Sequence, residues 1–116
     1  MTQRTERVGE ECREVIAEEV QRLKDPRVGF VTITGVKVSP DLRTARVYYT
    51  SLGDEAARAG TRAALRSAKP HLRAVLGREV RLKFLPDLEF EEDESMEAGR
   101  RIDQVLEQIH REHHDG

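Results

Sequence analysis

The sequence feature that most constrains the fold is a helical hydrophobic pattern in the middle of the chain, which a proline breaks once. Alanine-rich apolar positions recur at helical spacing from about Asp54 to Ala68, and the pattern resumes after Pro70 and stops at Gly77. Proline fixes φ and lacks a backbone N–H, so it kinks a helix or begins a new one as its first residue. The pattern therefore predicts two consecutive helices joined by a kink.

The residues before this helix pair predict one more helix and two strands. Apolar residues recur every three or four positions from Arg4 to Lys24, which is typical of a helix with one buried face. β-Branched residues dominate Phe30 to Ser39, and apolar and polar residues alternate from Arg43 to Thr50. The turn residues Ser39-Pro40-Asp41 between the two runs predict an antiparallel hairpin. The alternation changes phase at Gly35, as a β-bulge would produce.

Two further elements are predicted after the helix pair. Glu79 to Leu85 reads as a third strand, with apolar residues on one face and Arg81 and Lys83 on the other. Ser95 can cap a last helix, and residues 111–116 should fray. With 116 residues the chain has room for one domain with one core. We therefore expect an α+β domain with a three-stranded sheet, helices on one face of it, and a C-terminal helix.

Charge is distributed unevenly along the chain, although the formal net charge is only −2. Between Thr61 and Pro86 seven basic residues stand against one acidic residue, and from Asp87 to Glu97 seven acidic residues follow with no base. The basic set, called the basic arm below, is a candidate phosphate-binding surface, the alternative being a solvated helix and strand face. The acidic segment is interpreted as a solubilising loop. The residues of the basic arm are Arg62, Arg66, Lys69, Arg73, Arg78, Arg81 and Lys83.

Patterns typical of enzymes and metal proteins are poor. The single cysteine, Cys12, excludes an internal disulfide and falls on the apolar face of the first helix. His110, His113 and His114 could share a helical face, but near the fraying end they indicate adventitious metal binding. No apolar run is long enough for a membrane span, and the polar N-terminus does not resemble a signal peptide. We expect a non-catalytic cytoplasmic protein without a cofactor.

The aromatic residues limit how RNA could be bound. There are five, and Tyr49 and Phe84 lie on the apolar side of their predicted strands. So few aromatic rings do not favour a platform on which several bases stack. Contacts to RNA should be dominated by phosphates and shape, with a strong dependence on salt.

Short motifs follow one another in a fixed order from about Arg4 to Ile109. In that order they resemble the bacterial ribosome-binding factor A family. They are Lys24-Asp25-Pro26-Arg27-Val28-Gly29, Val31-Thr32-Ile33-Thr34, Val36-Lys37-Val38-Ser39-Pro40-Asp41-Leu42, Ala45-Arg46-Val47-Tyr48-Tyr49, Leu52-Gly53, Leu72-Arg73, Leu76-Gly77, Pro86-Asp87-Leu88-Glu89-Phe90, Asp93-Glu94-Ser95 and Ile102-Asp103.

The resemblance implies a type II KH-like fold, α-β-β-α-kink-α-β, with residues 4–90 as the RNA-binding unit. Residues 91–116 would then hold the acidic segment, a C-terminal helix and the frayed tail of the same domain. It implies a monomeric assembly factor that binds the free or immature small ribosomal subunit and its 16S rRNA. Such a factor assists processing of the 5′ end of that rRNA. Ribosomal proteins and an assembly GTPase are further candidate partners.

The helix kink is where this chain departs from the family. An Ala-x-Gly motif is expected there, and Ala68-Lys69-Pro70 stands in its place. Pro70 should preserve the kink while removing the backbone N–H that a glycine would offer. Two other classes of function stay open: an adaptor whose acidic segment, Asp87 to Glu97, docks a basic protein, and a small hydrolase. The absence of any nucleophile–base pair disfavours the hydrolase.

Overall fold

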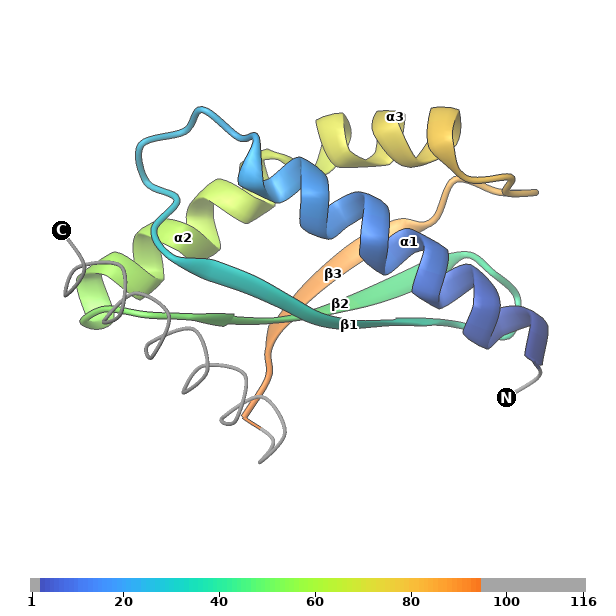
Figure 1. Cartoon of the computed structure of the whole chain (residues 1–116), viewed down its shortest axis with the longest axis horizontal. Coiled ribbons are helices and arrows are strands. Elements are labelled where there is room, and N and C mark those ends of the chain that lie inside the picture. The colour runs from blue at the N-terminus through green and yellow to red at the C-terminus, as the bar shows by residue number, and fades with distance from the viewer. Residues whose placement is uncertain (1–2, 95–116) are drawn as a thin grey trace, which may run out of the picture.

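The computed structural model describes residues 3–94, which form three helices and a three-stranded sheet. All three helices lie on one side of the sheet (Figure 1). The strand order is β1-β2-β3; β1 and β2 pair antiparallel, whereas β3 pairs with β2 in parallel. The predicted α+β architecture is confirmed, and the predicted C-terminal helix lies outside the described residues. The elements are α1 (Gln3–Gln21), β1 (Val31–Val38), β2 (Thr44–Ser51), α2 (Glu55–Ser67), α3 (Lys69–Glu79) and β3 (Asp87–Glu92).

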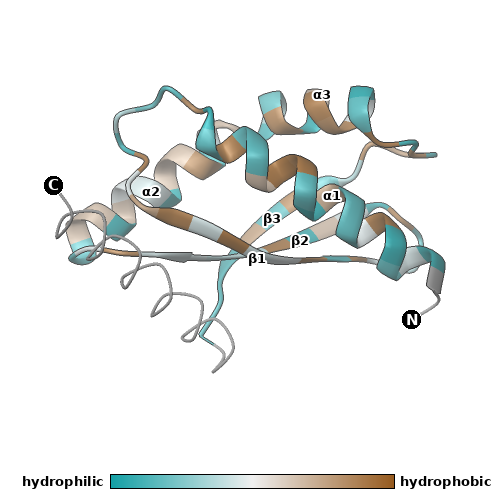
Figure 2. Ribbon diagram, viewed as in Figure 1, coloured by the Kyte–Doolittle hydropathy of each residue, from teal (hydrophilic) through white to brown (hydrophobic). Residues whose placement is uncertain are grey.

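The core lies between the helices and the inward face of the sheet. Cys12, Ile16 and Val20 form a buried stripe along α1 at steps of four residues. Hydrophobic and hydrophilic residues alternate along α1 in Figure 2, as expected for a helix with one buried face. Burial raises the pKa of the Cys12 thiol to about 11. Cys12 is therefore a core side chain, as predicted, and not a reactive thiol.

The β1–β2 hairpin confirms two sequence predictions. The strands pair antiparallel, and the register shifts between Ile33 and Gly35, which is the predicted β-bulge. The turn that joins the strands is closed by the Leu42 N–H, which donates to the Ser39 carbonyl oxygen at 2.8 Å. Leu42 has a φ of 63°, in the left-handed region that residues with a side chain rarely adopt.

The kink between α2 and α3 is a single residue. Ala68 is at once the C-cap of α2 and the N-cap of α3, with φ −83° and ψ −6°. Pro70 falls in the first turn of α3, where a backbone N–H would have no helical acceptor. At the other end of α2, the Asp54 side chain accepts a hydrogen bond from the Ala57 N–H at 2.8 Å. The predicted helix–kink–helix is confirmed.

The third strand lies later in the chain than predicted. Residues 80–86 form a loop, and the strand is Asp87–Glu92. The Arg73 side chain donates to the carbonyl oxygens of Leu85 and Pro86, so the backbone there bonds to α3 and not to the sheet. The prediction of a strand from Glu79 to Leu85 is therefore wrong. Of its alternating apolar residues, Val80 is buried at the end of α3 and Phe84 lies against Arg43 of the hairpin turn.

The acidic segment was interpreted as a loop, and this is wrong for residues 87–92, which form β3. Leu88 and Phe90 face the core, with Leu88 only 2% exposed, while Asp87, Glu89 and Glu91 are exposed. β3 is at the edge of the sheet, where outward charges oppose pairing with another chain. The acids are thus the solvated face of an edge strand.

Candidate nucleic-acid interface

A shallow groove runs between the α2–α3 pair and β3. Two adjoining pockets form it and share Lys69 and Glu89 in their linings. The helix side of the groove is basic and the strand side carries acids, so phosphate groups would bind along the helix side. The lining residues are Arg62, Arg66, Lys69, Pro70 and Arg73 from the helices and Asp87, Leu88, Glu89 and Phe90 from the strand.

Four residues of the basic arm line the helix side of the groove because of their spacing in the sequence. They are Arg62, Arg66, Lys69 and Arg73. Their sequence steps are four, three and four, which place side chains on one face of a helix. The steps cross the kink, and since the kink is a single residue in helical conformation, the row continues from α2 into α3. The kink therefore aligns the cations of two helices along one groove.

Two of the four groove cations are already engaged within the protein. Arg62 pairs with Glu55 at 3.3 Å. Arg73 donates from Nε to the Pro86 carbonyl oxygen at 3.0 Å and from Nη2 to that of Leu85 at 3.2 Å. Arg73 therefore holds the loop before β3 against α3. Within residues 3–94, Arg66 and Lys69 make no ion pair or side-chain hydrogen bond, which leaves them available to a ligand.

The acids of β3 are largely matched by arginines from neighbouring elements. Arg46 lies 3.6 Å from Glu89 and 3.5 Å from Glu91, and Arg58 bonds to Glu92. The hydrogen bond to Glu92 raises the pKa of Arg58. Exposed pairs of this kind add little stability each, but they offset the negative potential beside the groove. The strand wall is consequently less repulsive to phosphate than its sequence suggests.

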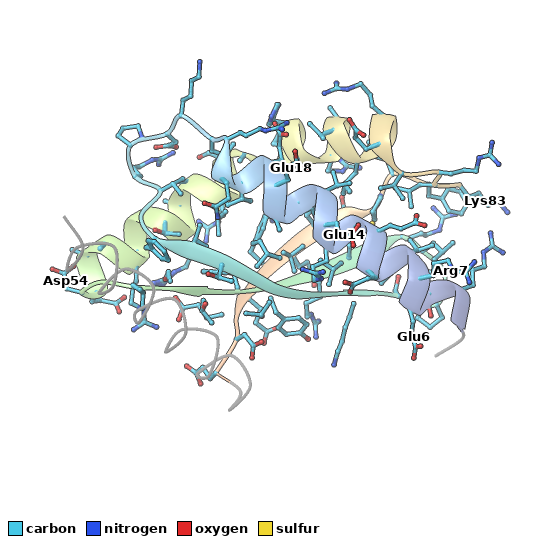
Figure 3. All side chains as sticks on the ribbon, in the orientation of Figure 1. Glu6, Arg7, Glu14, Glu18, Asp54 and Lys83 are labelled. Atoms are coloured by element: carbon cyan, nitrogen blue, oxygen red, sulfur yellow. The ribbon has the colours of Figure 1, made fainter. Side chains whose placement is uncertain are left out.

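The remaining residues of the basic arm lie beyond the groove. Arg78 is in the last turn of α3, and Arg81 and Lys83 are exposed in the loop 80–86. Figure 3 shows Lys83 at one end of the molecule, with Asp54 and the start of α2 at the opposite end. The structure thus separates the basic arm into two sets, four residues in the groove and three beyond it. The sequence predicts one surface for all seven.

Arg27 is a cation near the kink that the sequence analysis did not identify. Its Nη2 donates to the Ser67 hydroxyl at 3.2 Å, and its guanidinium hydrogen bonds to Asp25 lower the pKa of that carboxyl to about 2. The same loop is tied to α2 by the Gly29 N–H, which donates to Thr61 Oγ1 at 3.0 Å. Local sequence gives no sign of this contact, because Arg27 and Ser67 are 40 positions apart.

The element order, the kinked helix pair and the groove beside the sheet edge define a type II KH-like domain. The model of one protein family, Ribosome-binding factor A, matches residues 4–106 of the chain. The chain therefore belongs to the ribosome-binding factor A family, and the resemblance found in its motifs is confirmed.

Individual relatives agree with this assignment. The chain is 48% identical over 113 residues to the ribosome-binding factor A of Geobacter sulfurreducens, covering 97% of this chain and 96% of the relative. A Thermotoga maritima protein solved by NMR is 35% identical with a TM-score of 0.71, over 83% of this chain and 92% of its own. A third relative is a homology model of the Thermus thermophilus ribosome-binding factor A, as fitted into a cryo-EM map of a 30S complex. It is 36% identical with a TM-score of 0.61, over 72% of this chain and 88% of its own.

Residues 3–94 contain neither a membrane-spanning helix nor a metal-binding cluster. None of the helices in that range is long and apolar enough to cross a membrane. Nor does any group of three or more His, Cys, Asp or Glu residues there come close enough to hold a metal ion. His110, His113 and His114, interpreted as an adventitious metal-binding cluster, lie outside residues 3–94.

Proposed function

We propose that this chain binds the free or immature small ribosomal subunit through its 16S rRNA. By doing so it assists late maturation, including processing of the 5′ end of that rRNA, and it catalyses no reaction itself. Membership of the ribosome-binding factor A family supports this, as does the Thermus thermophilus relative in its 30S complex. The observation that carries the proposal is the row of cations that crosses the kink, with Arg66 and Lys69 free of ion pairs within residues 3–94.

Neither Ala68 nor Pro70 has a backbone N–H to offer a phosphate at the kink, so side chains should supply the main contacts there. Pro70 has no N–H, and Ala68 already donates its N–H to carbonyl oxygens of α2. An arginine and a lysine on successive turns can each neutralise one phosphate and release its counterions. The resulting affinity should fall steeply with salt and depend little on base sequence.

Co-sedimentation tests the proposal directly. The purified protein would be mixed with free small subunits, large subunits and assembled ribosomes at low and at high salt. We expect binding confined to free or immature small subunits and weakened by salt. Equal binding to all three particles, or none, would contradict the proposal.

A charge-reversed pair, Arg66→Glu with Lys69→Glu, tests the groove itself. It should abolish co-sedimentation, because it replaces two phosphate contacts with repulsion. The matched control is Arg13→Glu on α1 with Arg22→Glu just after its end, which changes the net charge equally but lies outside the groove. Circular dichroism would show that both proteins are folded. Comparable losses in the two variants would mean that overall charge, and not the groove, determines binding.

An adaptor that docks a basic protein through its acidic segment is the second candidate function. Neutralising Glu91, Glu92 and Glu94 together separates the two, since rRNA binding predicts little loss and the adaptor predicts a large one. The ion pairs of Glu91 with Arg46 and of Glu92 with Arg58 favour rRNA binding, because they already occupy these acids.

A further inference from the structure

Two loops that are far apart in the sequence meet at one end of the molecule. Arg43, at the end of the hairpin turn, lies over the ring of Phe84 in the loop 80–86, with its guanidinium carbon 4.1 Å from the ring centre. The Lys83 ammonium group lies 5.5 Å from the same centre. The Arg43 carbonyl oxygen accepts a hydrogen bond from the Asp87 N–H at 2.9 Å. The two loops therefore form one continuous surface.

The hairpin turn holds Arg43 in a fixed position. Asp41 accepts a hydrogen bond from the Arg43 N–H at 3.1 Å and another from the Ser39 hydroxyl at 2.6 Å. The Ser39 hydroxyl in turn accepts from the Thr44 N–H at 3.1 Å. Leu42 keeps a left-handed backbone within this network, and such strain persists only where the surroundings enforce it. The turn is thus pre-organised, and the backbone that carries the Arg43 side chain is held in one conformation.

The surface has the chemistry that recognises a single nucleotide. A guanidinium stacked on an aromatic ring keeps its outer face free, and nucleobases stack on such arginine planes. Arg43 is exposed, and Phe84 is only partly buried behind it. Arg81 and Lys83 are exposed in the same loop and make no ion pair within the described residues, so they are available to the flanking phosphates.

We infer that Arg43, Phe84, Arg81 and Lys83 form a second RNA contact, which stacks one unpaired base on Arg43 and binds its phosphates through Arg81 and Lys83. The inference rests on the proposed function, since it supplies RNA as the partner. An acidic peptide would be attracted by the charges alone and would gain nothing from the planar stack. The contact is separate from the groove, because none of its four residues lines either groove pocket.

A hairpin RNA with one bulged adenine, compared with the same hairpin carrying an abasic bulge, isolates the stacking contribution. Fluorescence anisotropy would measure both affinities for the full-length protein. We expect the adenine bulge to bind more tightly, by on the order of tenfold, as for one base stacked on a protein side chain. Arg43→Lys keeps the charge but lacks the plane, so the ratio should fall to about one. Equal affinity of the unaltered protein for the two hairpins would overturn the inference.

Two further variants separate stacking from folding and from overall affinity. Phe84→Tyr keeps the ring and should keep the preference, whereas Phe84→Leu should lose it, and thermal unfolding would show whether each is folded. Arg66→Glu with Lys69→Glu should weaken both hairpins equally and preserve the ratio. If polyglutamate displaced the RNA, and Arg43→Lys weakened the polyglutamate as much as it weakened the RNA, the surface would be a protein site and the inference would fail.

The outcome can be distinguished from failure of the proposed function. If the unaltered protein co-sediments with small subunits but shows no preference for the adenine bulge, only the second contact is wrong. If the preference is present but no subunit binding occurs, the contact stands and the proposed function fails.

Discussion

The two halves of the basic arm differ in how their cations are held. In the groove, Arg62 and Arg73 are bonded to neighbouring groups, and α2 and α3 fix the spacing of the whole row. Beyond the groove, Arg81 and Lys83 lie in a loop whose position depends on Arg73 and on the contact between Arg43 and Phe84. The comparison shows that a count of charges along a sequence does not reveal which of them are available to a ligand.

The largest expected effect on the affinity for small subunits comes from removing two cations that make no ion pair, first from one half of the basic arm and then from the other. Arg66→Ala with Lys69→Ala should lower the affinity for small subunits by about tenfold or more, because two phosphate contacts are lost from a rigid row. The slope of log affinity against log salt should fall by about 1.5. Arg81→Ala with Lys83→Ala should lower the affinity less, because these residues lie in a loop and not in a rigid helical row, while the slope should fall by a similar amount, since two phosphate contacts are again lost. Co-sedimentation across a salt series measures both, and a larger loss from the loop pair would reverse the comparison.

Replacing Arg73 should lower the stability of the fold, whereas replacing Arg66 and Lys69 should weaken binding to small subunits. Arg73→Ala removes hydrogen bonds to the carbonyl oxygens of Leu85 and Pro86 and should lower the free energy of unfolding by about 1–2 kcal/mol. Arg78→Ala, five residues later in α3 and exposed, should change it by less than about 0.5 kcal/mol. Urea denaturation measures both. A similar small effect from the two variants would show that the loop before β3 does not depend on Arg73.

Neutralising an acid on the strand side of the groove should change the affinity for small subunits by less than removing the groove cations does, and should raise it. Glu89→Gln removes a negative charge from both groove pockets and should raise the affinity for small subunits by about threefold at low salt. The gain should vanish at high salt because of screening. A reduced affinity would instead favour the adaptor function.

The smallest expected effect is that of pH on the hairpin turn. The Ser39 hydroxyl and the Arg43 N–H hold the pKa of Asp41 below its usual value. A lowered pKa means that the contribution of this carboxylate to stability is present above its unfolded-state pKa and is lost only as pH falls through the folded-state value. The NMR chemical shifts of Arg43 and Thr44, followed as pH is lowered, should therefore show a titration midpoint below 3.8, the usual pKa of an aspartate. A midpoint at or above that value would show that Asp41 is not held in this way.

Most of the fold was predictable because it follows from local patterns. The stripe on α1, the phase change at Gly35 and the proline at the kink each reflect a constraint within a few residues. The position of β3 was not predictable in this way. Residues 79–85 and 87–92 both alternate, and only the structure shows that Arg73 binds the carbonyl oxygens of Leu85 and Pro86 while residues 87–92 pair with β2.

The groove was predictable in part. The steps of four, three and four from Arg62 to Arg73 already place these cations on one helical face. That Arg73 is structural and that Arg43 lies over Phe84 could not be read from the sequence, because both facts depend on where β3 begins. Residues that are 41 positions apart meet there only after the sheet has closed.

The parallel pairing of β3 with β2 sets when this domain can be completed during synthesis. A parallel strand can join only after a crossover, so α2 and α3 must be made before β3 reaches its place. A nascent or truncated chain that ends before Asp87 has α1 and the hairpin but leaves the edge of β2 unpaired. Such an edge is a template for association with another chain. Pairing of β3 with β2, once β3 has left the ribosome, is therefore the step that covers this edge and closes the domain.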